Sequence, residues 1–381
     1  MPPSPQSAPP SGHIAAHLPA LRDQWKSPND ILSLLMVIGG DIVRSALSQP
    51  ASTSHSRFFT PVAFSFGWVA YSFSAILSAV GSRRLVSDPD CRCTLIEVES
   101  GYSRDVNSWA VSRLVRDYQS NHNRRSGLEI TFYDINPEKD TGVPDRDWVY
   151  FLGVFVILLQ FAIAVIPGAL DGNWPVMMVT CGGNLLAQLQ ASLPQWRREL
   201  WDARSIKAGK REVVCLTKGN GSPYVMVVRS EGSLEHRRLR LADLAGGQGT
   251  AVAGSKRTIC ATLALTLLWF VLLLTMLGVE DGSWYMLAIG AIGMLQNVIA
   301  AGARRESAAL GFHLLKRSTL HDEKVFKAIK EAEKLEPRVG LALLNIFFPG
   351  DLREHEKKWR QETKDKYKQE KEVSEREAVK S

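Results

Sequence analysis

The sequence predicts an all-α transmembrane helical bundle of five or six spans, built partly from repeated helical hairpins, with a small α/β domain in the cytosol. Five stretches of more than 20 residues carry no charged side chain, and a helix of about 20 apolar residues crosses the hydrocarbon core. One turn motif occurs in two similar copies, GALDGNW at residues 168–174 and GVEDGSW at 278–284. Lys and Arg gather between the charge-free stretches, as the positive-inside rule describes for cytosolic loops.

The charge-free stretches predict transmembrane helices at residues 58–82, 148–170, 172–196, 258–279 and 282–303. The second and fourth are apolar all round, which favours a membrane over the alternative of a large all-helical soluble core. The third and fifth contain side-chain amides. Such amides are accepted in a membrane helix that turns them toward other helices. We therefore expect each amide-bearing stretch to pair with the strong span before it, as a hairpin.

The first apolar segment, DILSLLMVIGGDIVRSAL, contains Asp41 and Arg44 in its second half. These two residues lie three apart, on one face of a helix, where they can pair. If the segment spans, the protein has six spans and two cytosolic termini. If it lies in the interface, the protein has five spans and its N-terminus is outside. An ionisable pair within a membrane is costly and marks a functional site.

The distribution of basic residues sets the expected orientation. The two repeated turns contain no Lys or Arg, whereas the loops 83–147 and 197–257 and the chain after 303 are rich in both. The turns should therefore face the outside or a lumen, with the loops and the C-terminus in the cytosol. The sequence predicts an integral multi-pass protein of the plasma membrane or an endomembrane, with the lipid bilayer as its surroundings.

The repeated turns align at an offset of 110 residues, which places Gly172 on Gly282 and Trp174 on Trp284. The same offset aligns two stripes of mostly small residues along helix faces, which allow helices to approach closely. Duplication of a hairpin explains this, and so does convergence on common hairpin turns. The candidate residues for helix packing or a pathway are Asp41, Arg44, Gly183, Asn184, Ala187, Gln188, Gly293, Gln296 and Asn297.

The polar loops predict a small α/β domain of about four strands and a helix. Strand patterns occur at 94–100 and 128–135, a helix pattern lies between them, and two strands flank a Gly-Asn-Gly-Ser turn in 211–230. Thr319 and Asp322 form a capping-box pattern before an expected helix. The predicted segments are 1–29 (disordered tail), 30–48 (embedded or interfacial helix), 58–82 (span), 83–147 (cytosolic), 148–196 (hairpin), 197–257 (cytosolic), 258–303 (hairpin), 304–350 (amphipathic helix and apolar segment) and 351–381 (charged tail).

No catalytic, cofactor-binding or metal-binding residues are predicted. Cys91 and Cys93 are too close for the usual zinc spacing, and no histidine lies within the five predicted spans. The stretch GTAVAGSK reads Gly-Ser-Lys where a phosphate loop needs Gly-Lys-Ser/Thr. The basic segments lack the interleaved aromatics expected of a nucleic-acid-binding face. The sequence gives no support for an enzyme and none for nucleic-acid binding, and it does not indicate an oligomeric state.

The stretches DILSLLMVIGGDIVRSAL and TPVAFSFGWVAYSFSAILSAVG resemble a group of uncharacterised multi-pass membrane proteins of filamentous fungi. The resemblance runs over most of the chain between its tails, and it implies an integral membrane protein with no assigned activity. Two functions stay open at this point. One is a non-enzymatic membrane protein whose cytosolic domain binds a protein partner. The other is a transporter or channel that uses polar residues of the repeated hairpins.

Overall fold

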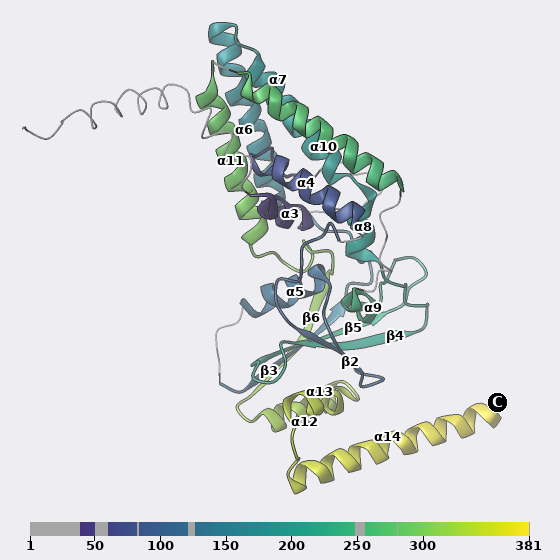
Figure 1. Cartoon of the computed structure of the whole chain (residues 1–381). Coiled ribbons are helices and arrows are strands. Elements are labelled where there is room, and N and C mark those ends of the chain that lie inside the picture. The colour runs from purple at the N-terminus through teal and green to yellow at the C-terminus, as the bar shows by residue number, and fades with distance from the viewer. Residues whose placement is uncertain are drawn as a thin grey trace, which may run out of the picture.

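The computed structural model describes residues 39–49, 60–81, 84–120, 126–247, 256–279 and 281–380. A helical region and a six-stranded sheet domain stand end to end (Figure 1). Trp68 and Trp269 in the helical region and Leu95 and Tyr224 in the sheet belong to one continuous cluster of buried apolar side chains. The two regions therefore share one hydrophobic core and are not independent domains joined by a linker.

The helical region consists of two long helix pairs and two shorter helices. The first pair is α6 (Trp148–Asp171) and α7 (Pro175–Ala191), and the second is α10 (Lys256–Leu277) and α11 (Ser283–Gly302). The arms of the second pair pack mainly on other elements, since α10 lies against α4 and α7 while α11 lies against α6 and α3. The shorter helices are α3 (Gly40–Ser48) and α4 (Gly67–Val80), which pack on each other.

The predicted all-α bundle of five or six spans is wrong. In the described part of the chain, three helices are long and apolar enough to cross a membrane: α6, α10 and α11. The expected span at 58–82 fails because residues 60–66 are not helical and α4 has only 14 residues. Helix α7 has 17 residues, between Pro175 and the Pro194 that begins α8 (Pro194–Trp201). Helix α3 has nine, and residues 30–38 of its predicted segment lie outside the described residues.

The sheet is also larger than the predicted domain of about four strands. Six strands lie in the order β2-β1-β4-β5-β3-β6, with β3 and β5 parallel and the other neighbours antiparallel. The strand predicted at Leu128–Ile135 is present as β3. The predicted C-terminal helix starts later than expected, because its supposed first turn is strand β6. The strands are β1 (Thr94–Glu97), β2 (Ser103–Asp105), β3 (Leu128–Ile135), β4 (Arg211–Thr217), β5 (Tyr224–Glu231) and β6 (Leu314–Asp322).

Helices cover both faces of the sheet. Helices α5 (Trp109–Ser120) and α9 (Leu241–Gly246) contribute to the core shared with the helical region. On the other face, α12 (Val325–Leu335) and α13 (Val339–Phe347) bury a second apolar cluster against β3, β4 and β5. The last helix, α14 (Glu354–Lys380), packs beyond them through Trp359 and extends from the end farthest from α6 and α7 (Figure 1).

The two repeated turns lie together at one end of the helical region. Gly172 ends α6 in a left-handed conformation (φ 70°), whereas Gly282, in the same conformation (φ 90°), precedes the first residue of α11. The Asn173 side-chain amide donates to the Asp281 carbonyl at 3.0 Å. The two copies of the turn thus have different roles, one ending a helix and one beginning a helix, and they contact each other directly.

Candidate functional site

The non-helical segment 60–66 runs through the interior of the helical region. Its side chains are buried, and its main chain lacks the internal hydrogen bonds that a helix supplies to itself. Pro61 removes one donor and biases Thr60 toward an extended conformation. Non-helical backbone at membrane depth is stable only where protein groups satisfy it. The neighbouring helices must therefore supply the partners of this segment.

Side-chain amides from α7 and α11 are among those partners. Gln188 accepts from the Thr60 amide (3.0 Å) and donates to the Thr60 carbonyl (2.8 Å). Gln296 accepts from the Ala63 amide and donates to the Pro61 carbonyl, both at 3.1 Å. Each glutamine thus holds one donor and one acceptor of the segment, as a paired strand would.

Further amides bind the segment around Phe64. Asn184 accepts from the Phe64 amide (3.3 Å), and Gln160 of α6 donates to the Phe64 carbonyl (2.7 Å). Gln160 also accepts from Asn184 (3.2 Å), so the two side chains are linked. Asn297 donates to the Ser65 hydroxyl at 2.8 Å. The sequence pointed to Asn184 and Asn297 but missed Gln160, although it is the one amide within an otherwise apolar span.

Glycines on three helices make room for the segment. A Cβ on Gly293 would lie 1.8 Å from the Phe64 carbonyl oxygen, and a Cβ on Gly153 would lie 2.0 Å from the Pro61 carbonyl oxygen. A Cβ on Gly183 would meet the Phe64 ring at 2.6 Å. Gly183 and Gly293, which the repeat aligned, therefore make room for a non-helical segment between helices, instead of bringing two helices into contact. Ala187 is fully buried in the same core.

Asp41 and Arg44 lie apart from this network, at the end of the helical region that faces the sheet. Arg44 donates to the main-chain carbonyls of Arg84, Leu85 and Val86 at 2.8–2.9 Å, and Asp41 is exposed. Arg44 therefore fixes the chain that leads into β1. The structure brings six of the nine candidate residues together around segment 60–66, places Ala187 in the same core, and leaves Asp41 and Arg44 outside.

A buried cluster of charges joins the helical region to the sheet domain. Arg113 on α5 is almost fully buried and pairs with Asp90 (2.7 Å) and Asp117 (3.2 Å). It also donates to the Ala301 carbonyl at 2.8 Å and to the Ala303 carbonyl, at the end of α11. Cations are favoured at a helix C-terminus, where main-chain carbonyls lack partners. The sheet domain thus caps α11, a long helix of the helical region.

Arg305 connects three helix ends at this contact between the helical region and the sheet domain. It pairs with Asp147 through two hydrogen bonds of 2.7 Å, and it donates to the Gln49 carbonyl at 3.1 Å. Asp147 also caps the start of α6 by accepting from the Tyr150 amide. Because Arg305 follows α11 and Gln49 follows α3, the ends of α3 and α11 and the start of α6 are fixed against one another.

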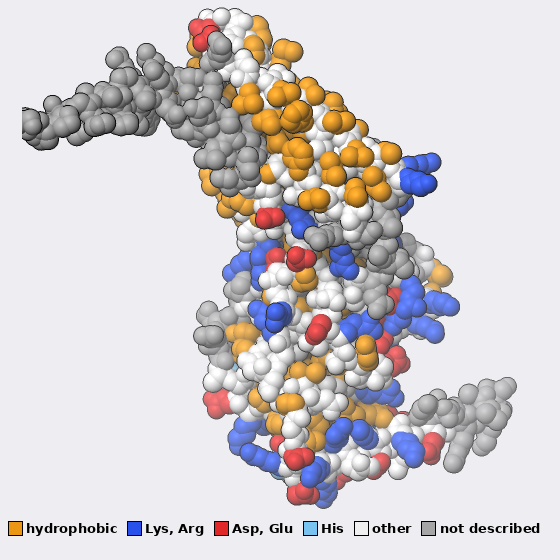
Figure 2. Space-filling model, in the orientation of Figure 1, with side chains coloured by type: hydrophobic (Ala, Val, Ile, Leu, Met, Phe, Trp, Pro, Cys, Tyr) orange, Lys and Arg blue, Asp and Glu red, His pale blue; other side chains and the backbone are white. Residues whose placement is uncertain are grey.

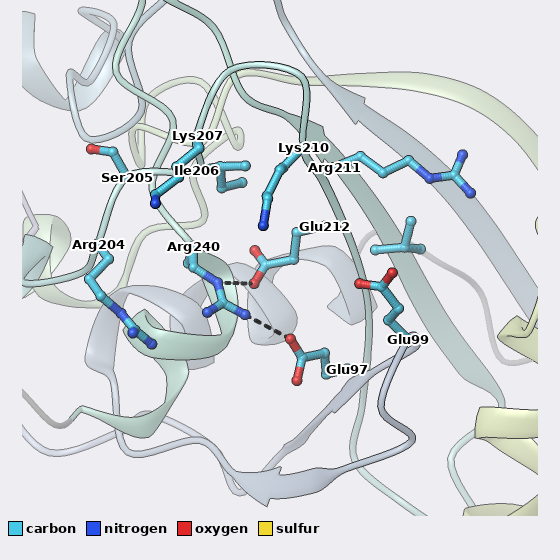
Figure 3. Close-up of a pocket in the computed structure, with 11 residues that line it drawn as sticks. Glu97, Glu99, Arg204, Ser205, Ile206, Lys207, Lys210, Arg211, Glu212 and Arg240 are labelled. Carbon is cyan, nitrogen blue, oxygen red and sulfur yellow. Dashed lines mark hydrogen bonds and ion pairs between the residues drawn. The ribbon is translucent and has the colours of Figure 1, made fainter. Parts of the chain in front are cut away.

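The sheet domain contains a charged pocket of about 310 Å³ between β1, β4 and the loop 204–210 (Figure 3). Arg240 lies at its centre, bonded to Glu97 at 2.8 Å and to Glu212 at 3.3 Å. Lys207 and Lys210 are exposed at its rim. Within the described residues neither lysine has a carboxylate at ion-pair distance, so the pocket can take an anionic group.

The carboxylate at the base of the pocket is strongly held. Glu212 is buried and accepts from the Leu241 amide at 2.8 Å, at the start of α9. Burial raises the pKa of Glu212 despite this hydrogen bond and the nearby Arg240. On the pocket's outer side, Arg204 is turned toward Asp243, which it binds at 2.7 and 2.9 Å. The hydrogen bond from Arg204 lowers the pKa of Asp243.

The described residues contain no group of three or more His, Cys, Asp or Glu side chains that could hold a metal ion. Cys91 and Cys93 are free thiols, and a hydrogen bond from Cys93 lowers the pKa of Cys91 to about 7.

Comparison with known proteins adds no identity: no family model, no curated protein and no solved structure matches the chain.

Proposed function

We propose that this chain is an integral membrane protein that holds a non-enzymatic binding domain rigidly against one face of the bilayer. The observation that carries the proposal is the junction, in which Arg113 of the sheet domain caps α11. A domain that served only as a soluble appendage would not need a buried arginine bound to the end of a membrane helix. The rigid attachment supports a role in presenting a binding surface in a fixed orientation.

The distribution of side chains supports the membrane part of the proposal. Hydrophobic side chains dominate the visible face of the helical region, and Lys, Arg, Asp and Glu gather on the sheet domain (Figure 2). Exposed apolar residues on the long helices include Phe155, Leu158 and Leu267, each more than 60% exposed. An apolar surface of this kind is unfavourable in water and matches hydrocarbon. In this arrangement the sheet domain lies in the cytosol and the repeated turns lie on the other side.

The charged pocket supports the binding part of the proposal. Its arginine is fixed by two carboxylates, and its lysines are left without carboxylate partners among the described residues. The paired Arg240 and the unpaired Lys207 and Lys210 together are suited to a partner that brings its own acidic groups. We place the contact with a cytosolic protein partner at this pocket.

A transporter or channel lined by the hairpin amides has less support. Gln188, Gln296 and Asn184 each bind the main chain of segment 60–66. An amide engaged in this way is a structural group, because freeing it would leave a buried main-chain group without a partner. No observation in the described residues favours a pathway along these side chains over a structural role.

The orientation is tested by cysteine labelling in sealed vesicles with a membrane-impermeant maleimide. Asp171→Cys lies in the first turn, and Asn220→Cys lies in the β4–β5 turn; both positions are exposed. In a background where the native cysteines are replaced by alanine, we expect the two sites to be labelled from opposite sides. Labelling of both from the same side would refute the membrane arrangement.

The binding role is tested by crosslinking capture with the full chain in its membrane. Lys207→Glu with Lys210→Glu reverses the pocket's free charges, and Lys368→Glu is a matched control on α14. We expect a partner that crosslinks to the wild type and the control, and that is lost with the pocket variant. Identical capture by all three chains would refute the pocket as the binding site.

A further inference from the structure

A second cleft lies on the side of the sheet domain away from the helical region, between the β1–β2 turn, α13 and α14. It has a volume of about 350 Å³. Arg338, Arg360 and Lys364 line it, and they come from the residue before α13 and from successive turns of α14. Within the described residues, no carboxylate lies at ion-pair distance from any of these three side chains. The cleft therefore gathers cations whose charge is not neutralised locally.

The backbone holds one of these cations in an unusual position. Arg338 has φ 70°, the left-handed conformation that side chains other than glycine rarely adopt. Glu333 stabilises it by accepting from the Arg338 and Leu341 amides at 2.7 and 3.1 Å, and the Tyr367 hydroxyl donates to the same carboxylate. Such strain persists where the surroundings fix it, often at binding sites. The Arg338 guanidinium then lies over the Tyr367 ring, 5.3 Å from its centre.

The acidic residues near the cleft do not cancel its charge. Glu333 is not among the lining residues. Its carboxylate accepts from two main-chain amides and from Tyr367, and it forms no ion pair with the three cations. Glu99 is the one carboxylate among the lining residues. It also lines the pocket around Arg240, so it separates the two sites. Three cations against one carboxylate leave the cleft with a positive excess.

We propose that this cleft binds a phosphate monoester group. Two guanidinium groups and an ammonium from different elements suit the several oxygens and the double negative charge of such a group. The cleft is larger than a phosphate alone needs and falls within the range of small-molecule sites, so the group is carried by a small molecule or a lipid headgroup. The proposal concerns a different cleft from the partner pocket and does not depend on it.

Binding is measured by calorimetry on the full chain in detergent, with inorganic phosphate and inorganic pyrophosphate as probes at constant ionic strength. Arg360→Gln and Lys364→Gln remove charges that α14 contributes to the cleft, and Lys368→Gln, on the same helix but not among the lining residues, is the matched control. A charge-assisted hydrogen bond contributes enough for each single variant to weaken binding about tenfold. We expect the double variant to lose binding, and the control to bind as the wild type does.

Vesicles containing phosphatidic acid, whose headgroup is a phosphate monoester, distinguish the two sources of the ligand. Binding of the soluble probes that the double variant abolishes indicates a soluble ligand. Binding restricted to the vesicles, again abolished by the double variant, indicates a lipid. The proposal is overturned if no probe binds saturably, if the double variant binds as the wild type does, or if Lys368→Gln weakens binding as much as the double variant.

Discussion

Substitution of Gly293 by alanine tests whether segment 60–66 depends on the glycine at its crossing with α11. The added Cβ would lie 1.8 Å from the Phe64 carbonyl oxygen, and real contacts of this kind stay above 3.0 Å. This oxygen belongs to the backbone, so the clash cannot be relieved by the rotation of a flexible side chain. The segment must move away from α11, and the hydrogen bond from Gln160 to the Phe64 carbonyl (2.7 Å) must break or shift.

The expected loss of stability follows from these contacts. A buried polar group left without its partner costs about 1–3 kcal/mol. Overpacking in a dense core costs about 1–3 kcal/mol more. We therefore expect Gly293→Ala to lower the free energy of unfolding by about 3 kcal/mol. Gly302→Ala, on the same helix with open space around its Cβ, should be neutral or stabilise by up to about 1 kcal/mol.

The assay is denaturant unfolding of the full chain in mild detergent, followed by tryptophan fluorescence. Trp269 stacks on Phe64 with 6.0 Å between ring centres, so a displaced segment should also change the emission of the folded state. The reasoning fails if Gly293→Ala unfolds within about 0.5 kcal/mol of the wild type, the spread expected of a neutral surface substitution.

Three further predictions concern the sheet domain and its junction. Arg113→Ala removes the buried guanidinium that pairs with Asp90 and Asp117, and it should lower the free energy of unfolding by about 3–5 kcal/mol. Arg116→Ala, at 29% side-chain exposure, should cost about 1 kcal/mol or less. Denaturant titration checks both. The pKa of Glu212 is raised, so the folded state keeps the carboxyl proton to higher pH than the unfolded chain does. The contribution of Glu212 to stability is therefore present at low pH and is lost as the pH rises through the raised pKa. Melting temperatures measured against pH should decline less for Glu212→Gln than for the wild type. Alkylation of Cys91 by iodoacetamide, followed by mass spectrometry of its peptide, should have a midpoint near its pKa of about 7, and Cys93→Ala should slow it more than tenfold at pH 7 by removing the hydrogen bond to the thiolate.

Local pattern predicted the strands best. The β-branched and aromatic residues of Leu128–Ile135 predict a strand that the structure contains as β3. The Gly-rich turn at 219–222 likewise separates β4 from β5, which pair as a hairpin. By contrast, the capping-box pattern at Thr319 and Asp322 was misleading, because pairing of β6 with β3 outweighs it. A local signal fails where an edge strand gains hydrogen bonds from a distant neighbour.

The helical region was harder to predict for the same reason. Pro61 is a visible sign against a continuous helix at 58–82, and the prediction, made from the absence of charge, did not use it. The residues that stabilise the non-helical segment are distant: Asn184 lies 120 positions from Phe64, and Gln296 lies 233 positions from Ala63. The amides could be identified as unusual from the sequence alone. Their partners could not, because main-chain groups carry no sequence signal.

The distance along the chain between segment 60–66 and its partners constrains the order of assembly during synthesis. The segment emerges early, whereas Gln160 follows about a hundred residues later and Gln296 only with α11. In the membrane arrangement proposed above, the Pro61 carbonyl and the Ala63 amide lack their partners until α11 has entered the membrane, and hydrocarbon offers no substitute. The N-terminal part must therefore wait near the membrane surface or beside the insertion machinery. A chain cut before residue 296 should leave it there, however well α6 and α7 have inserted.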